Sequence, residues 1–315
     1  MSRIEQDFLG TREIGDDIYY GVQTIRGKEN FHITGIPMNQ EPYFVKALGY
    51  VKKAAAMANR DLGALDATVA DAIISGCDRV IAGDMMDQFV TDFIQGGAGT
   101  STNMNANEVI ANLALESLGY RKGDYQQVSP NDHVNYGQST NDTYPTAFRL
   151  ALILRLDSYI TALRQLQDAF FAKGREFDRV LKMGRTHLQD ATPIRLGQEF
   201  EGYAGQIERG RARLEYAISE LREVALGGTA VGTGINTHKE FAARVCEKLS
   251  DWNGFEVVET SNHFQAQATL DGLVGASGAL KTIAVSLLKI ANDIRWLGSG
   301  PRAGIGEIEL PAVQP

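Results

Sequence analysis

The chain has 315 residues, 43% of them hydrophobic, and a formal net charge of −8 at pH 7. This length and composition are typical of a globular protein of about two domains, and they exclude a disordered polypeptide. The acidic balance, without a run of lysine or arginine, offers no attraction for nucleic acid or an anionic membrane. Two cysteines, Cys77 and Cys246, are too few for a disulfide framework, so we expect a reducing, cytoplasmic location.

The N-terminal segment does not resemble a secretory signal peptide. It is charged from Arg3 onward and lacks the apolar core of a signal peptide. No stretch reaches about 18 consecutive apolar residues, so we expect no membrane-spanning helix. The longest apolar-rich run, residues 283–291, is interrupted by Lys289 and is predicted to be a core helix.

The first part of the chain, residues 1–141, is predicted to form a small, mostly helical N-terminal domain. Apolar residues recur at helical spacing over residues 43–62 and 67–86, and a further helix is expected at residues 103–118. Turn-rich pieces such as residues 33–42 separate these helices.

The remaining part, residues 142–315, is predicted to form an elongated central helix bundle. Residues 147–173 contain neither glycine nor proline and carry apolar residues every three or four positions. Long helices are also predicted for residues 198–226 and 268–297, and a capping box at Thr237–Glu240 predicts a shorter one up to Trp252. Helices of this length bury a continuous stripe only against equally long partners. The fold class is therefore predicted to be all-α (mainly helical), with the bundle completed by other subunits.

Two polar segments precede predicted helices and could bind an anion. GAGTSTNMNANE at residues 97–108 places Thr100 beside a glycine turn, and residues 133–147 place Ser139, Thr140 and Asn141 ahead of the first long helix. Free backbone N–H groups and the helix dipole attract negative charge at such positions. The alternative is that these side chains only cap their helices.

Two further segments are less specific when they are taken singly. Thr186 and His187 lie in a polar stretch before another long helix, where the histidine could carry a proton or serve a structural role. The glycine-rich segment at residues 227–240 lacks both a phosphate-loop and a dinucleotide-binding pattern and is predicted to be a structural turn. No histidine or cysteine spacing matches a metal site, so we expect neither metal nor cofactor.

Taken together, these segments resemble the aspartase/fumarase superfamily. The blocks GTSTNMNANEVIANLALE, QSTNDTYPTA, GRTHLQDATPIRLGQEF, GGTAVGTGINT and SGPRAGIGEIELP match that family in order and spacing along nearly the whole chain. The resemblance is closest to the ammonia-lyase branch. Class II fumarases usually carry a serine where this chain has Ala98, and they usually contain QSSND where this chain has Gln138–Asp142 as QSTND.

The resemblance implies that L-aspartate loses ammonia and forms fumarate. A base would remove a proton from Cβ, and the neighbouring carboxylate would take up the charge as an aci-carboxylate that needs fixed hydrogen-bond donors. The donors implied for that carboxylate are Thr100, Ser139 and Thr140. The remaining implied contacts are Asn141 and His187 to the amino group and Thr186 to the α-carboxylate. Members of the family are homotetramers whose active sites are each built from three subunits.

The family pattern continues beyond this sequence. Members usually carry, after the proline-rich stretch that ends here at Pro315, a flexible loop whose serine acts as the base. The expectation is therefore that this chain holds substrate-binding donors but no catalytic base, that its bundle is incomplete at the C-terminal end, and that it is weakly active or inactive alone. Two alternatives remain: a hydratase that interconverts L-malate and fumarate, and a non-catalytic helical oligomer that keeps the fold.

Overall fold

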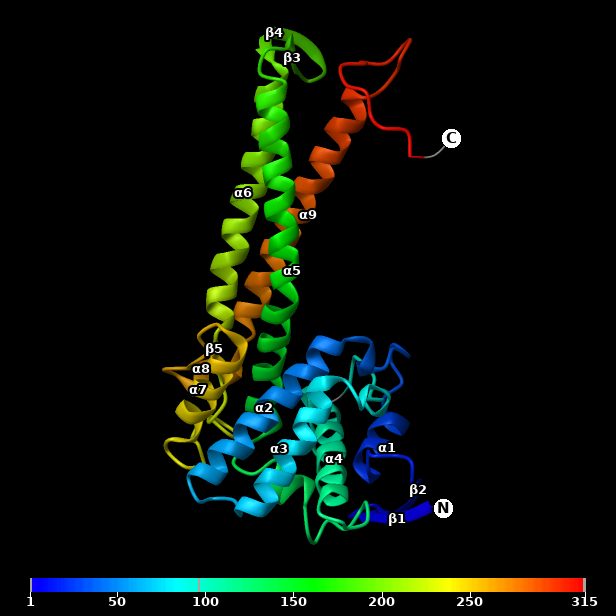
Figure 1. Cartoon of the computed structure of the whole chain (residues 1–315), viewed down its shortest axis with the longest axis vertical. Helices are drawn as coiled ribbons and strands as arrows, with labels where there is room; N and C mark the ends of the chain where they lie inside the picture. Colours follow the sequence, from blue (N-terminus) through cyan, green and yellow to red (C-terminus); the bar gives the residue numbers. More distant parts are fainter. Residues whose placement is uncertain (1, 96, 314–315) are drawn as a thin grey trace. The chain divides into compact units, whose positions relative to one another are not determined.

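The computed structural model describes residues 2–95 and 97–313 and is mainly helical, which confirms the predicted fold class (Figure 1). The helices are α1 Val22–Asn30, α2 Pro42–Asp61, α3 Ala67–Ala82, α4 Thr100–Ser117, α5 Thr140–Glu176, α6 Leu196–Leu221, α7 Phe241–Asn253, α8 His263–Ala268 and α9 Asp271–Leu297. The strands are β1 Ser2–Asp7, β2 Gly10–Gly15, β3 Leu181–Thr186, β4 Gln189–Arg195, β5 Glu223–Val224 and β6 Val258–Glu259. They form three two-stranded sheets: the antiparallel pairs β1–β2 and β3–β4 and the parallel pair β5–β6.

The chain divides into two compact units. Unit 1 consists of Met1–Arg155 and Leu221–Leu270, and unit 2 consists of Leu156–Glu220 and Asp271–Pro315. This division differs from a single boundary between residues 141 and 142, because Leu221–Leu270 returns to the unit that contains the N-terminal helices. Helix α5 begins in unit 1 and ends in unit 2.

Unit 1 has a core built around the alanine-rich helix α2. Small residues such as Ala54 and Ala58 are fully buried on α2, where they allow α3, α4 and α7 to pack close to it. At Gly76 of α3, an added Cβ would lie 3.1 Å from the backbone oxygen of Ile110 in α4. Close packing against α2 and α3 therefore fixes the position of α4.

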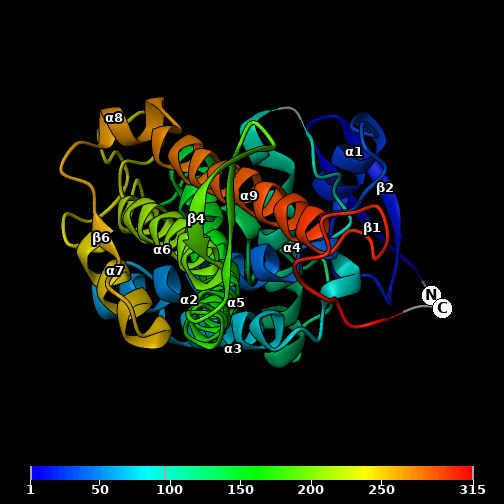
Figure 2. The same cartoon turned by 90° about the horizontal axis from the view of Figure 1, so that it is seen from above.

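Unit 2 consists of the C-terminal half of α5, helices α6 and α9, the β3–β4 hairpin and the segment after α9 (Figure 1, Figure 2). Phe170 of α5 packs against Phe200 and Tyr203 of α6, with ring centroids 6.3 and 5.8 Å apart. Gly210 of α6 faces Ile283 of α9, because a Cβ there would lie 2.9 Å from that side chain. The predicted long helices therefore do pack along one another.

Several boundaries differ from the sequence-based predictions. Helix α5 begins at Thr140, seven residues before the glycine- and proline-free stretch 147–173, and it contains Pro145, which removes one backbone donor from its second turn. The predicted capping box at Thr237–Glu240 is wrong: α7 begins at Phe241, and its N-cap residue Glu240 makes no side-chain capping bond. The two hairpins were not predicted, because each of their strands buries at most one residue and so lacks a clear alternating apolar pattern.

Helix α9 combines length with exposed apolar side chains. Within the described residues it is the one helix long and apolar enough to cross a membrane by length and composition, and 22% of its most apolar window is buried. One such helix is weak evidence for a membrane span, because core helices of soluble proteins share these properties. Its exposed residues instead form a stripe: Val274, Val285 and Leu288 lie on one face at helical spacing.

Candidate active site

Thr100 is the first residue of α4 and follows a tight glycine turn. Gly99 adopts a φ of 97°, and an added Cβ would collide with the ring of Tyr144 in α5. The first turn of α4 is capped from the preceding loop, because the Thr102 N–H donates to Oε1 of Gln95 at 2.8 Å. Thr100 itself is exposed at the helix start. A glycine is therefore required where the α4 start meets α5.

The start of α5 is organised by the buried carboxylate of Asp142. Its Oδ1 accepts the Ser139 N–H at 2.9 Å, and its Oδ2 accepts the N–H groups of Gly227 and Thr229 at 3.1 and 2.8 Å. Burial raises the pKa of Asp142 to about 6, although these N–H donors oppose the rise. Asn141 donates through Nδ2 to the Ala230 carbonyl at 2.7 Å. The glycine-rich segment after β5 thus anchors the turn that carries Ser139, Thr140 and Asn141.

One asparagine joins the two helix starts. Asn103 of α4 is 1% exposed, and its Nδ2 lies 3.1 Å from Oγ1 of Thr140 and 3.2 Å from Oδ1 of Asn135. Within unit 1, the polar segment at α4 and the polar segment at α5 are therefore parts of one hydrogen-bonded network.

A buried lysine lies beneath this network. Lys52 of α2 is fully buried, and its Nζ donates to Oδ1 of Asn135 at 2.8 Å and to Oε1 of Gln138 at 3.0 Å. Burial lowers the pKa of Lys52 to about 7, although the charge of Asp142 opposes the fall. The two amide side chains that accept from Lys52 lie in the segment immediately before Ser139. The lysine therefore helps to fix the backbone that leads to Ser139 and Thr140.

Thr186 and His187 belong to unit 2, where they lie at the turn of the β3–β4 hairpin. His187 and Leu188 both have positive φ, 52° and 62°, which is the geometry of a two-residue hairpin turn. Thr186, His187 and Leu188 are exposed. The hairpin therefore presents the hydroxyl and the imidazole outward from the surface of unit 2.

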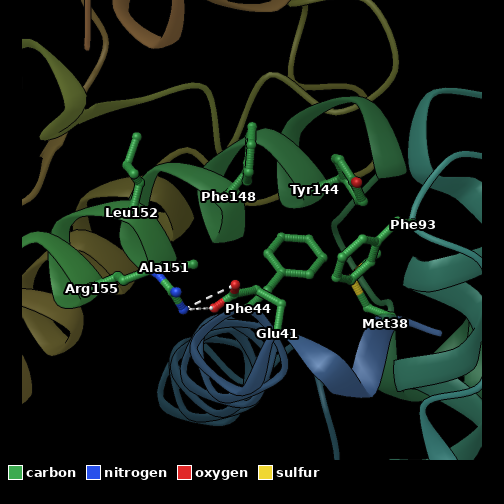
Figure 3. A pocket seen from close by; sticks show the side chains of 9 residues that line it. All are labelled: Met38, Glu41, Phe44, Phe93, Tyr144, Phe148, Ala151, Leu152 and Arg155. Carbon is green, nitrogen blue, oxygen red and sulfur yellow. Dashed lines mark hydrogen bonds and ion pairs between the residues drawn. The ribbon is translucent and has the colours of Figure 1, made fainter. Parts of the chain in front are cut away.

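A separate pocket in unit 1 has a different chemistry (Figure 3). Its volume is about 350 Å³, and its lining is mainly apolar: Met38, Phe44, Phe93, Tyr144, Phe148, Ala151 and Leu152, with Glu41 and Arg155. An Arg155 nitrogen pairs with the two carboxylate oxygens of Glu41 at 2.8 and 3.1 Å. Because the guanidinium already binds a carboxylate, this pocket is poorly suited to a dicarboxylic acid. None of the predicted substrate-binding residues lines it.

Sequence reasoning missed two residues that support the site. Asp142 was detectable in principle, because Ser139 and Asp142 have the spacing of a capping box. Lys52 gave no such signal, since a lysine next to Lys53 on a predicted helix suggests an exposed face. Across residues 2–95 and 97–313, no three histidine, cysteine, aspartate or glutamate side chains are grouped as a metal site would require.

Comparison with known proteins identifies the chain's relatives. A sequence profile of a protein family named Lyase matches residues 10–315. Aspartate ammonia-lyases are 50% identical in Helicobacter pylori strain J99, 48% in Bacillus subtilis and 49% in Escherichia coli K12, each over 313 residues. These alignments cover 99% of this chain and 66–67% of each relative. The chain thus spans about two thirds of the length of the curated relatives it matches.

Solved structures give the same grouping. A fumarate lyase:delta crystallin from Brucella melitensis bound to cobalt superposes with a TM-score of 0.97 at 55% identity, covering 100% of this chain and 68% of that one. A class II fumarase from Schistosoma mansoni superposes with a TM-score of 0.95 at 35% identity, covering 100% and 69%. The fold is therefore shared with a fumarate lyase and with a class II fumarase, and sequence identity is higher to the aspartate ammonia-lyases than to this fumarase.

Proposed function

This chain belongs to the aspartase/fumarase superfamily of lyases, and we propose that its reaction is the conversion of L-aspartate to fumarate and ammonia. The family profile and the aspartate ammonia-lyases at about 50% identity support a carbon–nitrogen lyase. The observation that carries the proposal is the joined pair of helix starts in unit 1. There, the hydroxyl-bearing turn of Ser139 and Thr140 is fixed to α4 by Asn103.

The geometry suits the difficult step of this reaction. Removal of the Cβ proton leaves two negative charges on the neighbouring carboxylate, and the C–N bond then breaks as the C=C bond forms. Fixed donors stabilise such a charge most when they need no reorganisation. Thr100, Ser139 and Thr140 lie at the N-terminal ends of α4 and α5, where the helix dipoles also favour negative charge. We assign these three hydroxyls to the carboxylate that carries the developing charge.

The remaining assignments follow the family pattern. Asn141 and His187 are proposed to contact the α-amino group, and Thr186 the α-carboxylate. No catalytic base is assigned within the 315 residues, and the resemblance implies that a serine of the family's loop takes this role. The alternative hydratase reaction is less favoured because the class II fumarase is 35% identical, whereas the ammonia-lyases are 48–50% identical.

We further propose that the chain forms a homotetramer in which the long helices share one bundle. The stripe of Val274, Val285 and Leu288 on α9 is 60–68% exposed in a single chain, and Trp296 is 50% exposed. An apolar stripe along a helix of this length is stabilised by burial against other long helices. Sedimentation velocity should therefore give a mass four times the 34.4 kDa of one chain.

A cytoplasmic location is also proposed. Cys77 and Cys246 are both buried and free, which is compatible with a reducing compartment. Fractionation of the producing cell, with detection of the chain by a specific antibody, tests this proposal. Recovery in an extracytoplasmic fraction would contradict it.

The reaction is tested by following fumarate in the ultraviolet while L-aspartate and L-malate are offered separately. Fumarate formed from L-aspartate alone supports the ammonia-lyase, and fumarate formed from L-malate alone supports the hydratase. The same samples should be titrated with fumarate by calorimetry, because binding requires the donors but not the base. Thr100→Ala should weaken that binding, since it removes one carboxylate donor. Failure of the unchanged chain both to turn over L-aspartate and to bind fumarate would contradict the proposed function.

A further inference from the structure

The β3–β4 hairpin has little apolar burial to hold it in place. Leu181 and Leu188 are 77% and 65% exposed, and Met183 is 39% exposed. Along β4 almost every residue is exposed. A two-stranded hairpin is marginally stable in water unless something else supports it. The turn that carries Thr186 and His187 therefore depends on contacts other than a hydrophobic core.

The segment after α9 supplies such contacts through one carboxylate. The Glu307 and Ile308 N–H groups donate to the Leu297 carbonyl at 2.8 and 3.3 Å, so this segment folds back onto the end of α9. This backbone geometry directs the Glu307 side chain to the hairpin. Glu307 pairs with Arg185 at 2.5 Å and also with Lys182, both of which belong to β3.

The ion pairs are sheltered from solvent. The side chain of Lys182 is 5% exposed, that of Glu307 is 16% exposed, and that of Arg185 is 24% exposed. Lys182 also reaches Glu199 in the first turn of α6 at 2.7 Å. Burial alone would raise the pKa of Glu307, but hydrogen bonds from Arg185 and Lys182 hold it below its ordinary value. The carboxylate is therefore charged at neutral pH and bridges two cations of one strand.

We propose that Glu307 is a positioning residue for substrate binding: by holding Arg185 and Lys182, it fixes the β3–β4 hairpin and thereby places Thr186 and His187. Arg185 directly precedes Thr186, so the bridge acts at the residue next to the turn. The same carboxylate ties the hairpin to the segment that follows α9. This inference deepens the proposed function and rests on it for the roles of Thr186 and His187.

The first test measures order in the hairpin and does not depend on the reaction. Hydrogen exchange followed by mass spectrometry should compare the peptide spanning residues 181–195 in the unchanged chain and in Glu307→Ala. Exchange in the variant should be about tenfold faster there, because local opening becomes easier when a sheltered ion pair is lost. The β1–β2 hairpin in unit 1 is an internal reference that should not change. Glu309→Gln, an exposed carboxylate on the same segment, is the matched control.

The second test asks whether the hairpin order matters for binding through Thr186, the hairpin residue assigned to a carboxylate that fumarate also carries. The dissociation constant for fumarate should rise about tenfold in Glu307→Ala, a coupling typical of residues in one network. In the Thr186→Ala background, the same change should raise it less than about twofold, because the group being placed is already absent. Glu307→Gln, which keeps the shape and one acceptor oxygen, should lie between the unchanged chain and Glu307→Ala.

Three results would overturn the inference about Glu307, and a fourth would overturn the proposed function. Unchanged exchange at residues 181–195 in Glu307→Ala would overturn the inference, and so would faster exchange with no effect on fumarate binding. Additive effects of Glu307→Ala and Thr186→Ala on fumarate binding would overturn it as well, since Glu307 would then act elsewhere. If the unchanged chain binds no fumarate, the proposed function fails instead, and the exchange at the hairpin still decides whether Glu307 holds it.

Discussion

Replacing Lys52 with methionine should change how the free energy of unfolding depends on pH. The side chain is fully buried, and burial lowers its pKa from an ordinary 10.5 to about 7. A fall of this size corresponds to about 5 kcal/mol in favour of the neutral amine inside the fold. Methionine has a similar length, carries no charge and tolerates an irregular apolar site.

The sign of the effect follows from proton binding. Between pH 7 and pH 10.5 the unfolded chain holds the Lys52 proton and the folded chain does not, so folding becomes more favourable as pH rises. Below pH 7 both states are protonated, and the cost of the buried charge is constant. The unchanged chain should therefore gain about 1.4 kcal/mol per pH unit relative to Lys52→Met above pH 7, or about 2.7 kcal/mol from pH 7.5 to 9.5.

The charged groups that face Lys52 do not obscure this trend. Asp142, with a pKa of about 6, is largely ionised above pH 7, where the trend is expected, and burial raises the pKa of Cys77 well above its ordinary value. Asn135 Oδ1 also accepts from Asn103, and Gln138 Oε1 also accepts from Thr143, so neither amide oxygen is left without a donor in the variant.

The assay is urea denaturation at pH 6.5, 7.5, 8.5 and 9.5, at one protein concentration so that association does not change. Lys53→Met is the matched control, because Lys53 is the neighbouring lysine but lies partly exposed beside Asp78. Its difference from the unchanged chain should stay nearly flat with pH. A flat difference for Lys52→Met as well would refute the argument, since Lys52 would then keep an ordinary pKa in the fold.

Three further predictions concern the site and the assembly. Gly99→Ala should lower the free energy of unfolding by more than about 2 kcal/mol, because the added Cβ would collide with Tyr144. Gly63→Ala is the control: Gly63 also has a positive φ but has open space around it, so the loss should be about 1 kcal/mol. Thermal denaturation of the two variants tests this difference. In a form of the protein that also carries the family's serine loop, His187→Ala should lower L-aspartate turnover at least about 100-fold in steady-state kinetics, and unchanged kinetics would refute its assignment. Leu288→Glu should abolish the tetramer in sedimentation velocity, since it charges the exposed stripe of α9, and an unchanged mass would refute that interface.

The long helices were predictable because their signal is local. Residues 147–173 repeat apolar side chains at helical spacing, and the same pattern appears in α5 of the structure. Boundaries were less predictable because they depend on distant contacts. The start of α5 at Thr140 depends on Asp142, whose partners at Gly227 and Thr229 are far away in the sequence. The capping box at Thr237–Glu240 failed because spacing alone does not set the backbone geometry of a cap.

The candidate site shows the same division between local and distant information. Hydroxyl and amide residues at helix starts, such as Ser139 and Thr140, form motifs that are visible in the sequence. The charged residues that hold them are not, because a buried charge is recognisable only from the partners that compensate it. Lys52 and Glu307 are each defined by contacts to residues more than 80 positions away. Side chains proposed to touch substrate could thus be named from sequence, whereas those that place them required the structure.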